Sequence, residues 1–388
     1  YNVEIVLYYC IKDGMNIDPA CGSGGMFVSS SDFVNSEGIN ANSAMTFYGQ
    51  EKVEFNAKLC IMNMAVHGLN AKIKSGDEAN SFYHDAHNLE GSCDYVMANP
   101  PFNVDKVKAE STQNAGRLPF GLPGVNQKKE VSNANYLWIS YFYAYLNDSG
   151  RAGFVMAASA TDSGNKDREI RKELIQTGHI DCLMSVANNF FYKVSLPCSL
   201  WFFDKGKKEE LKDKVLFIDS RNYYTVVDRT LNEWSEWQMK NLNAIVWLYR
   251  GEKEKYTKLL QDYRTQIIND CRELDAAFES VSILLNGYGE KLKPLRVQIS
   301  DIVKISEDIN QLLPLNDLLK KYTTELNASL KALCEYGDGL EKGEAKEFAK
   351  SIDETASTWD RFKKSVSASI EEVVSQIKAC RTVIKEAK

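Results

Sequence analysis

The stretch MNIDPACGSGGMF, residues 15–27, decides the fold class of this 388-residue chain. A short apolar run leads into Asp18, a turn with three glycines follows, and a helical pattern then continues to about Asn35. Glycines let the backbone of such a turn approach a ligand closely, because they carry no side chain. Doubly wound sheets bind nucleotides at this position, beyond the carboxyl end of a strand. The stretch therefore predicts a strand, a turn that faces a ligand, and a helix.

The glycine spacing separates this turn from two well-known phosphate-binding motifs. It does not follow the G-x-G-x-x-G pattern of dinucleotide-binding proteins, and it lacks the Lys-Ser/Thr pair of a P-loop. On the glycines alone, an ordinary tight turn between a strand and a helix is as good an interpretation as a ligand site.

Short apolar runs alternate with helical patterns from the start of the chain to about residue 235. We expect strands at 15–17, 45–48, 71–74, 95–98, 152–158, 180–186, 199–203 and 215–218, and helices at 26–35, 53–67, 134–146 and 167–176. This alternation favours an α/β fold with a mostly parallel sheet that helices cover on both faces. Segment 103–133 lacks periodicity and is rich in Gly, Pro, Asn and Lys. We expect it to be a long loop, either functional or partly disordered.

Acidic residues also follow the second and third predicted strands. Glu51 is well placed to accept two hydrogen bonds from ribose hydroxyls, and Asp77 lies where it could meet an adenine ring. Taken alone, each of these residues is more often a helix cap. With Asp18 they occupy three successive strand ends, which parallel strands bring to one edge of a sheet.

The fourth predicted strand ends in Asn99-Pro100-Pro101-Phe102. A planar amino group is a poor nucleophile, but it improves when its two N–H bonds point at acceptors. The side-chain oxygen of Asn99 and the carbonyl of Pro100 supply two acceptors, and the prolines hold the backbone in one conformation. Phe102 offers a face on which a flat group can stack. The alternative is a proline-terminated strand with a buried Phe.

The composition narrows the class of protein. The net charge is −6, so a protein of this kind that works on a nucleic acid needs a local basic patch or a partner for its phosphate contacts. Nine cysteines outside any C-x-x-C pattern indicate reduced thiols. His84 and His87 lack further ligand candidates, so we interpret them as loop residues and expect no metal.

We expect a cytoplasmic protein that does not enter a membrane. The longest strongly apolar stretch, 136–146, is too short to span a bilayer, and no signal peptide is visible. The first residue is Tyr1 rather than Met, so we expect the chain to begin inside a longer polypeptide.

The chain changes character after about Trp237. Leu, Ile, Lys and Glu recur at helical spacing, and we expect helical segments at 238–285, 298–335 and 344–386. Long amphipathic helices pack as a bundle of their own or dock on partner helices. The sequence leaves both possibilities open.

In this order and spacing, the motifs resemble those of S-adenosylmethionine-dependent amino-methyltransferases. The likeness is greatest to the modification (M) subunits of type I restriction-modification systems, which make N6-methyladenine in DNA. It rests on DPACGSGG at 18–25, GQE at 49–51, GD at 76–77 and NPPF at 99–102. Further similar stretches are NANY at 133–136, GRAG at 150–153, REIRK at 168–172, NFFY at 189–192 and VLFID at 215–219.

The resemblance implies a Rossmann-like methyltransferase domain over residues 1–237 and a long-helix region for partner docking over 238–388. It implies S-adenosyl-L-methionine as cofactor and an adenine flipped out of DNA as substrate. The implied cofactor-binding residues are Asp18, Ala20, Gly22, Ser23, Gly24, Gly25, Glu51 and Asp77. The implied catalytic residues are Asn99, Pro100, Pro101 and Phe102, and Phe191 or Tyr192 is expected on the opposite wall of the base pocket.

The implied partners are DNA, a specificity subunit, a second M subunit and, in a complete system, a restriction subunit. The N-terminal helical domain and the Thr-Pro segment of the family are not visible here, and 1–11 looks like the tail end of that region. Three alternatives stay open. One is methylation of a glutamine amide, as in release-factor methyltransferases, which more typically carry Tyr after the prolines. The others are methylation of RNA adenine and a non-catalytic scaffold.

Overall fold

The computed structural model describes residues 14–36, 38–190 and 196–263, together with isolated helical positions between 265 and 378. The chain divides into two compact units, residues 1–256 and 257–388. The architecture described below is that of the first unit. Within the described part of the chain, no helix is long and apolar enough to cross a membrane.

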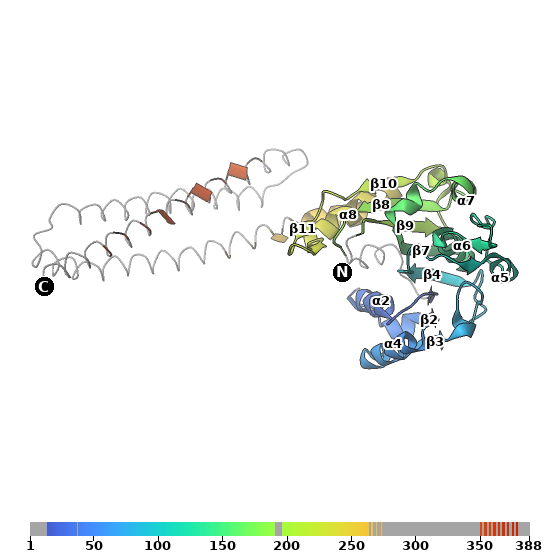
Figure 1. Ribbon diagram of the computed structural model, residues 1–388. Coiled ribbons are helices and arrows are strands. Elements are labelled where there is room, and N and C mark those ends of the chain that lie inside the picture. The colour runs from blue at the N-terminus through green and yellow to red at the C-terminus, as the bar shows by residue number, and fades with distance from the viewer. Residues whose placement is uncertain are drawn as a thin grey trace, which may run out of the picture. The chain divides into compact units, whose positions relative to one another are not determined.

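An eight-stranded sheet forms the centre of the first unit, with strand order β10-β8-β9-β7-β4-β1-β2-β3 (Figure 1). The strands are β1 (Gly14–Asp18), β2 (Met45–Glu51), β3 (Ala71–Ser75), β4 (Cys93–Ala98), β7 (Leu146–Ala157), β8 (Ile180–Val186), β9 (Cys198–Asp204) and β10 (Leu216–Asp219). β9 runs antiparallel to both of its neighbours, and the other pairs in this sheet are parallel. The eight predicted strands and the mostly parallel sheet are confirmed.

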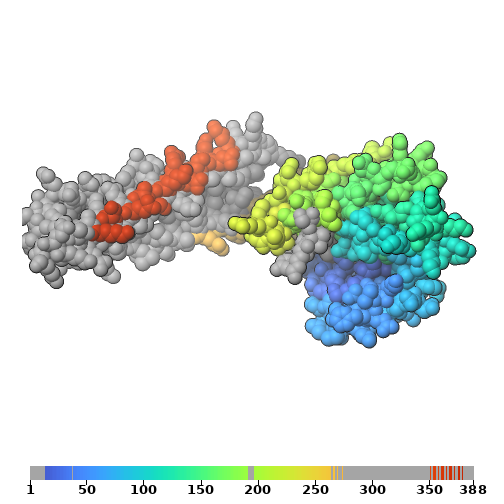
Figure 2. All heavy atoms as spheres, viewed as in Figure 1, coloured from blue at the N-terminus to red at the C-terminus, as the bar shows by residue number. Residues whose placement is uncertain are grey.

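Helices cover both faces of the sheet, as predicted. α2 (Gly25–Ser36), α4 (Glu54–Val66) and α8 (Glu236–Arg250) bury apolar side chains in one core cluster, and α6 (Asn135–Tyr145) and α7 (Asn165–Gln176) do so in the other. Ten of the eleven residues of α6 are buried, so this helix is enclosed on all sides. The two ends of the sheet, near β3 and near β10, lie at opposite ends of the unit (Figure 2).

The expectation of a long loop at 103–133, a segment that we call the insert, is only partly right. It contains β5 (Val107–Lys108), α5 (Ala109–Asn114) and β6 (Glu130–Val131), and β5 pairs with β6 in a small antiparallel sheet. Elements of two to six residues are too short to show a hydrophobic period, which explains why the sequence did not predict them. The remaining short elements are α3 (Ala41–Ala44), η1 (Asp77–Ala79), η2 (Ala158–Thr161), η3 (Glu209–Leu211), β11 (Thr225–Val226) and β12 (Asn232–Glu233).

The first compact unit ends later than the predicted boundary at residue 237. α8 belongs to this unit, because its Met239, Leu242 and Val246 pack into the same core cluster as the sheet. The helix expected over 238–285 stops at Arg250, where Gly251 takes a left-handed conformation with φ 76°, and helical structure resumes at Lys253. The expected helices at 298–335 and 344–386 lie outside the described residues, apart from isolated helical positions between 350 and 378.

Candidate active site

Asp18 ends strand β1 where the glycine turn begins. Its side chain is 1% exposed, and its Oδ1 accepts a hydrogen bond from the backbone N–H of Ala20 at 2.9 Å. Burial raises the pKa of Asp18 to about 7; the bond from Ala20 opposes this shift, and the nearby charge of Glu51 adds to it. A buried carboxylate of this kind gains stability from a ligand that brings a positive charge or a hydrogen-bond donor.

The three glycines of the turn have different roles. Gly22 and Gly24 adopt φ values of 53° and 78°, which favour glycine. A Cβ on Gly24 would lie 2.7 Å from the Sγ of Cys60 on α4, so this glycine allows the turn to approach that helix. Among the residues that the structure describes, none places an atom within 4 Å of a Cβ on Gly22 or on Gly25. The turn therefore packs against the protein on one side and leaves room for a ligand on the other.

Glu51 links the ends of β1 and β2. Its Oε2 accepts a hydrogen bond from the N–H of Gly22 at 3.0 Å, and its Oε1 accepts one from the N–H of Val53 at 2.8 Å. A third bond runs from the N–H of Cys21 to the carbonyl of Gln50 at 3.1 Å. These bonds hold the glycine turn and the carboxylate of Glu51 in a fixed arrangement.

The loop after β3 is tied to the same edge. Gly76, with φ 83°, donates its N–H to the carbonyl of Glu51 at 3.2 Å, and the exposed Asp77 follows it. The fully buried Gln50 donates from Nε2 to Ser81 Oγ at 2.9 Å and to the carbonyl of His84 at 3.1 Å. The ends of β1, β2 and β3 are thus joined by direct hydrogen bonds.

The residues Asn99–Phe102 leave the same edge of the sheet from β4. In the parallel pair β1–β4, Ile17 lies opposite Val96, so Asp18 is level with Met97 and Asn99 is two residues further out. With strands about 4.8 Å apart and a rise of about 3.3 Å per residue, the Cα atoms of Asp18 and Asn99 are about 8 Å apart. Asn99 is exposed, and Phe102 is half-buried against the core.

A cluster of three asparagines fixes the chain just beyond Phe102. Asn103, with φ 55°, donates its backbone N–H to Asn135 Oδ1 at 2.9 Å. Its own Oδ1 accepts bonds from Asn135 Nδ2 at 2.9 Å and from Asn133 Nδ2 at 3.0 Å. Asn135 is 2% exposed and lies in the enclosed helix α6. We call these three residues the asparagine clamp; it anchors Asn99–Phe102 on the side away from β4.

A family of known proteins matches this chain over most of the first unit. The sequence model of the N-6 DNA methylases matches residues 3–268, which is more than half of the chain. The chain belongs to the N-6 DNA methylase family.

Within this family, named relatives share substantial identity with the chain. The MjaIX type I restriction enzyme methylase subunit of Methanocaldococcus jannaschii is 39% identical over 236 residues, which cover 60% of this chain and 41% of the relative. The HindI type I restriction enzyme methylase subunit of Haemophilus influenzae is 32% identical over 223 residues, which cover 57% and 48%. The chain therefore spans about half the length of these curated relatives.

A solved structure shares the fold of this member of the N-6 DNA methylase family. The methyltransferase subunit of a type I restriction-modification system from Streptococcus thermophilus superposes with a TM-score of 0.54 at 19% sequence identity. The match covers 63% of this chain and 51% of that one. The Rossmann-like methyltransferase fold predicted from the motifs is thereby confirmed.

The predicted site residues that the structure describes gather at one edge of the sheet. The turn at 18–25, Glu51, Asp77 and Asn99–Phe102 all lie at or just beyond the carboxyl ends of neighbouring strands. Phe191 and Tyr192 lie outside the described residues. The sequence did not single out Gln50 or Asn103, although each lies next to a predicted site residue. Their roles depend on partners 31 to 36 positions away, which motif spacing does not reveal.

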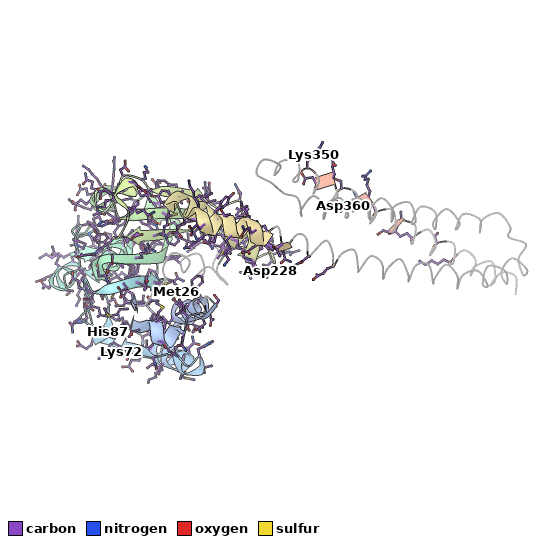
Figure 3. All side chains as sticks on the ribbon, turned by 180° about the vertical axis from the view of Figure 1, so that it is seen from behind. Met26, Lys72, His87, Asp228, Lys350 and Asp360 are labelled. Atoms are coloured by element: carbon purple, nitrogen blue, oxygen red, sulfur yellow. The ribbon has the colours of Figure 1, made fainter. Side chains whose placement is uncertain are left out.

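The two histidines of the H-x-x-H pattern lie in the loop after β3, as expected. His87 Nε2 is 3.0 Å from the carbonyl oxygen of Gly49, and burial lowers the pKa of His87. Its ring meets the edge of Tyr48, over which the Nζ of Lys72 lies at 4.9 Å from the ring centroid (Figure 3). These contacts assign His87 to packing of the loop.

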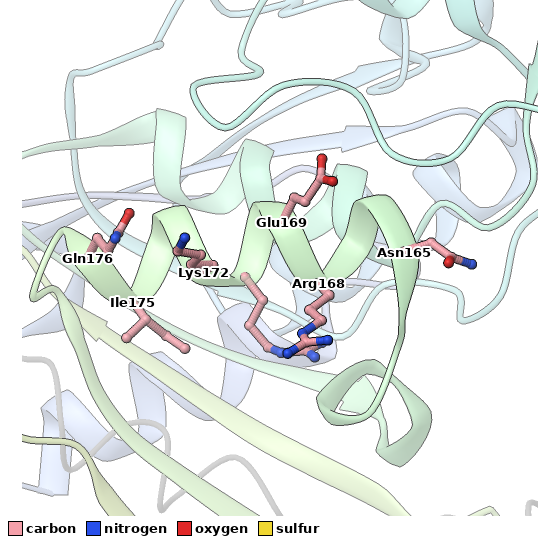
Figure 4. Close-up of a pocket in the computed structure, with 7 residues that line it drawn as sticks. Asn165, Arg168, Glu169, Lys172, Ile175 and Gln176 are labelled. Carbon is pink, nitrogen blue, oxygen red and sulfur yellow. The ribbon is translucent and has the colours of Figure 1, made fainter.

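A groove of about 690 Å³ lies along α7, apart from the residues discussed so far (Figure 4). Its lining residues all come from that helix: Asn165, Arg168, Glu169, Arg171, Lys172, Ile175 and Gln176. Arg171 is engaged with the hydroxyl of Tyr136 at 2.7 Å and the carbonyl of Ser163 at 2.9 Å. None of the predicted site residues lines this groove.

Proposed function

We propose that this chain transfers a methyl group from S-adenosyl-L-methionine to N6 of adenine in DNA, as part of the modification subunit of a type I restriction-modification system. The observation that carries the proposal is the meeting of the turn at 18–25, Glu51, Asp77 and Asn99–Phe102 at one sheet edge. The names of the relatives, which are methylase subunits of type I restriction enzymes, support the same assignment.

The turn and its neighbours fit S-adenosylmethionine, which supplies an activated methyl group on a sulfonium when bound. Asp18 would pair with the ammonium of the methionine end, which favours the charged form of its carboxylate. The open space at Gly22 and Gly25 leaves room for the same end of the molecule. Glu51 would accept hydrogen bonds from the ribose, and Asp77 would lie beside the adenine of the cofactor.

Asn99 and Pro100 would prepare the nucleophile. The Oδ1 of Asn99 and the carbonyl oxygen of Pro100 would each accept one N–H of the target amino group, which leaves its lone pair free for in-line attack. Both acceptors are held in advance by β4 on one side and by the asparagine clamp on the other, so no reorganisation is needed. Phe102 would stack on the adenine, which must leave the duplex to reach it.

We further propose that sequence recognition comes from a separate specificity subunit and that residues after Tyr256 form the docking region for partners. A second modification subunit and a restriction subunit would complete the system, which would act in the cytoplasm.

The test is transfer of labelled methyl from S-adenosylmethionine to DNA, with and without a co-expressed specificity subunit. We expect label in DNA as N6-methyladenine when the specificity subunit is present. Label in a protein glutamine or in RNA would overturn the substrate assignment. Absence of transfer in the assembled complex would favour a non-catalytic scaffold.

A further inference from the structure

The insert, residues 103–133, has the opposite charge balance to the whole chain. It contains five Lys or Arg residues against three Asp or Glu residues, whereas the net charge of the chain is −6. Four of the basic residues are exposed lysines, Lys106, Lys108, Lys128 and Lys129. Lys108 lies on β5 directly opposite Glu130, the first residue of β6, and Lys128 and Lys129 immediately precede Glu130.

Three basic residues of the insert adopt an unfavourable backbone conformation. Seven described residues other than glycine have positive φ, and four of them are asparagines, which tolerate it. The other three are Lys106, Arg117 and Lys129, with φ values of 60° to 61°, and all lie in the insert. The left-handed conformation costs such residues about 1–2 kcal/mol each.

The structure explains this conformation for Arg117. Arg117 is 2% exposed and donates to the hydroxyl of Tyr145 at 2.9 Å and to the carbonyl of Ser81 at 3.0 Å.

At Lys129 the conformation belongs to a turn, in which the N–H of Lys129 donates to the carbonyl of Asn126 at 3.0 Å and its carbonyl accepts from the N–H of Ala109 at 3.1 Å. These backbone bonds do not require a lysine side chain. Lys106 makes a 3.9 Å contact with Asp105, with both side chains more than 60% exposed, which contributes little to stability. Asn or Gly would occupy these two turns at lower cost, so the observation points to a use for the charges themselves.

The basic segment begins next to the proposed base pocket. Lys106 is four residues past Phe102, so their Cα atoms are at most about 14 Å apart. The asparagine clamp joins the two ends of the insert, and Val107 and Val131 are buried beneath β5 and β6. The lysines are therefore held on a fixed support within a few nucleotides of a base that stacks on Phe102.

We propose that Lys106, Lys108, Lys128 and Lys129 form a phosphate-binding edge that holds the DNA backbone beside the flipped adenine. This inference rests on the proposed function and names a surface for its substrate. Contacts to phosphates fix the position of a protein on DNA without reading its sequence. In this arrangement the lysines bind phosphates and a partner subunit reads the DNA sequence, which is consistent with the net negative charge of the chain.

The test uses a double variant, Lys106→Asn with Lys129→Asn, in the complex with the specificity subunit. Asn relieves the left-handed conformation, so we expect the melting temperature to stay equal or to rise. Each lost phosphate contact lowers the slope of log affinity against log salt by about 0.9. We therefore expect the slope for DNA to fall by about 2, with S-adenosylmethionine affinity unchanged.

The matched control is Lys212→Asn with Lys214→Asn. It removes the same charge at the end of the sheet opposite to the proposed site. Lys212 and Lys214 lie between the end of β9, which runs antiparallel to β7, and the start of β10. We expect the control to keep the wild-type salt slope. An unchanged slope in the Lys106/Lys129 variant, an equal loss in the control, or a loss of subunit assembly in place of DNA affinity would each overturn the proposal. If the wild-type complex itself transferred no methyl group to DNA, the proposed function would fail instead.

Discussion

The turn after β1 and the loop after β4 lie at the same edge of the sheet, but they are stabilised in different ways. The turn is held by the strand next to it, through the bond from the Gly22 N–H to Glu51 and the bond from the Cys21 N–H to Gln50. The loop is held through Asn103 by Asn133 and Asn135, which are 30 and 32 residues away, across the whole insert. The proposed cofactor half of the site thus depends on neighbouring strand ends, and the proposed target half depends on the residues that lead into α6.

The sharpest test of this comparison is at Asn103. Its Oδ1 only accepts bonds in the clamp, so Asn103→Asp keeps both acceptor bonds, while Asn103→Leu loses them at similar volume. Because a misplacement of about 1 Å can cost about 10²-fold in rate, we expect Asn103→Leu to lose transfer by about that factor. Asn103→Asp should stay within about threefold of wild type. Steady-state kinetics with equal S-adenosylmethionine affinities would locate the defect in the target half, and equal rates for both variants would refute the clamp.

Gly24 and Gly25 test the cofactor half with a smaller effect. Gly24→Ala places a Cβ 2.7 Å from Cys60 Sγ at φ 78°, so we expect a loss of stability of about 1–2 kcal/mol or more. Gly25→Ala, at the first position of α2, meets no atom of the described residues within 4 Å and should leave the melting temperature unchanged. If the cofactor fills that space, its affinity should fall about tenfold in Gly25→Ala, as calorimetry would measure. Wild-type affinity in this variant would mean that the space serves another purpose.

Asp18 gives an effect on stability that depends on pH. Burial raises the pKa of this carboxyl from 3.8 to about 7, so the folded protein binds its proton more tightly than the unfolded chain does. The contribution to stability is therefore greatest below about pH 4 and declines as the pH rises to about 7. Asp18→Asn should melt a few degrees higher than wild type at pH 8, with a smaller difference at pH 5, in thermal scans without cofactor. A variant that melts lower than wild type at pH 8 would contradict this account.

The sequence predicted those strands and turns that are determined by residues close together along the chain. The eight strands and the turn at 18–25 are marked by apolar runs and glycines within a few residues. It did not predict the asparagine clamp, the role of Gln50 or the pairing of β5 with β6, because these depend on partners that are distant along the chain. The sequence also did not predict that α8 ends before Gly251, because a single glycine between two helical patterns is only a weak signal for the end of a helix.

Methyl transfer by wild type and Asn99→Ala, assayed in parallel at saturating S-adenosylmethionine in the complex with the specificity subunit, tests the central claim most directly. Removing one preorganised contact to the reacting group typically costs about 10²–10³ in rate. We predict N6-methyladenine in DNA from wild type, a loss of at least about 10² in Asn99→Ala, and cofactor affinity within about twofold. Transfer to adenine at the wild-type rate in Asn99→Ala would contradict the account.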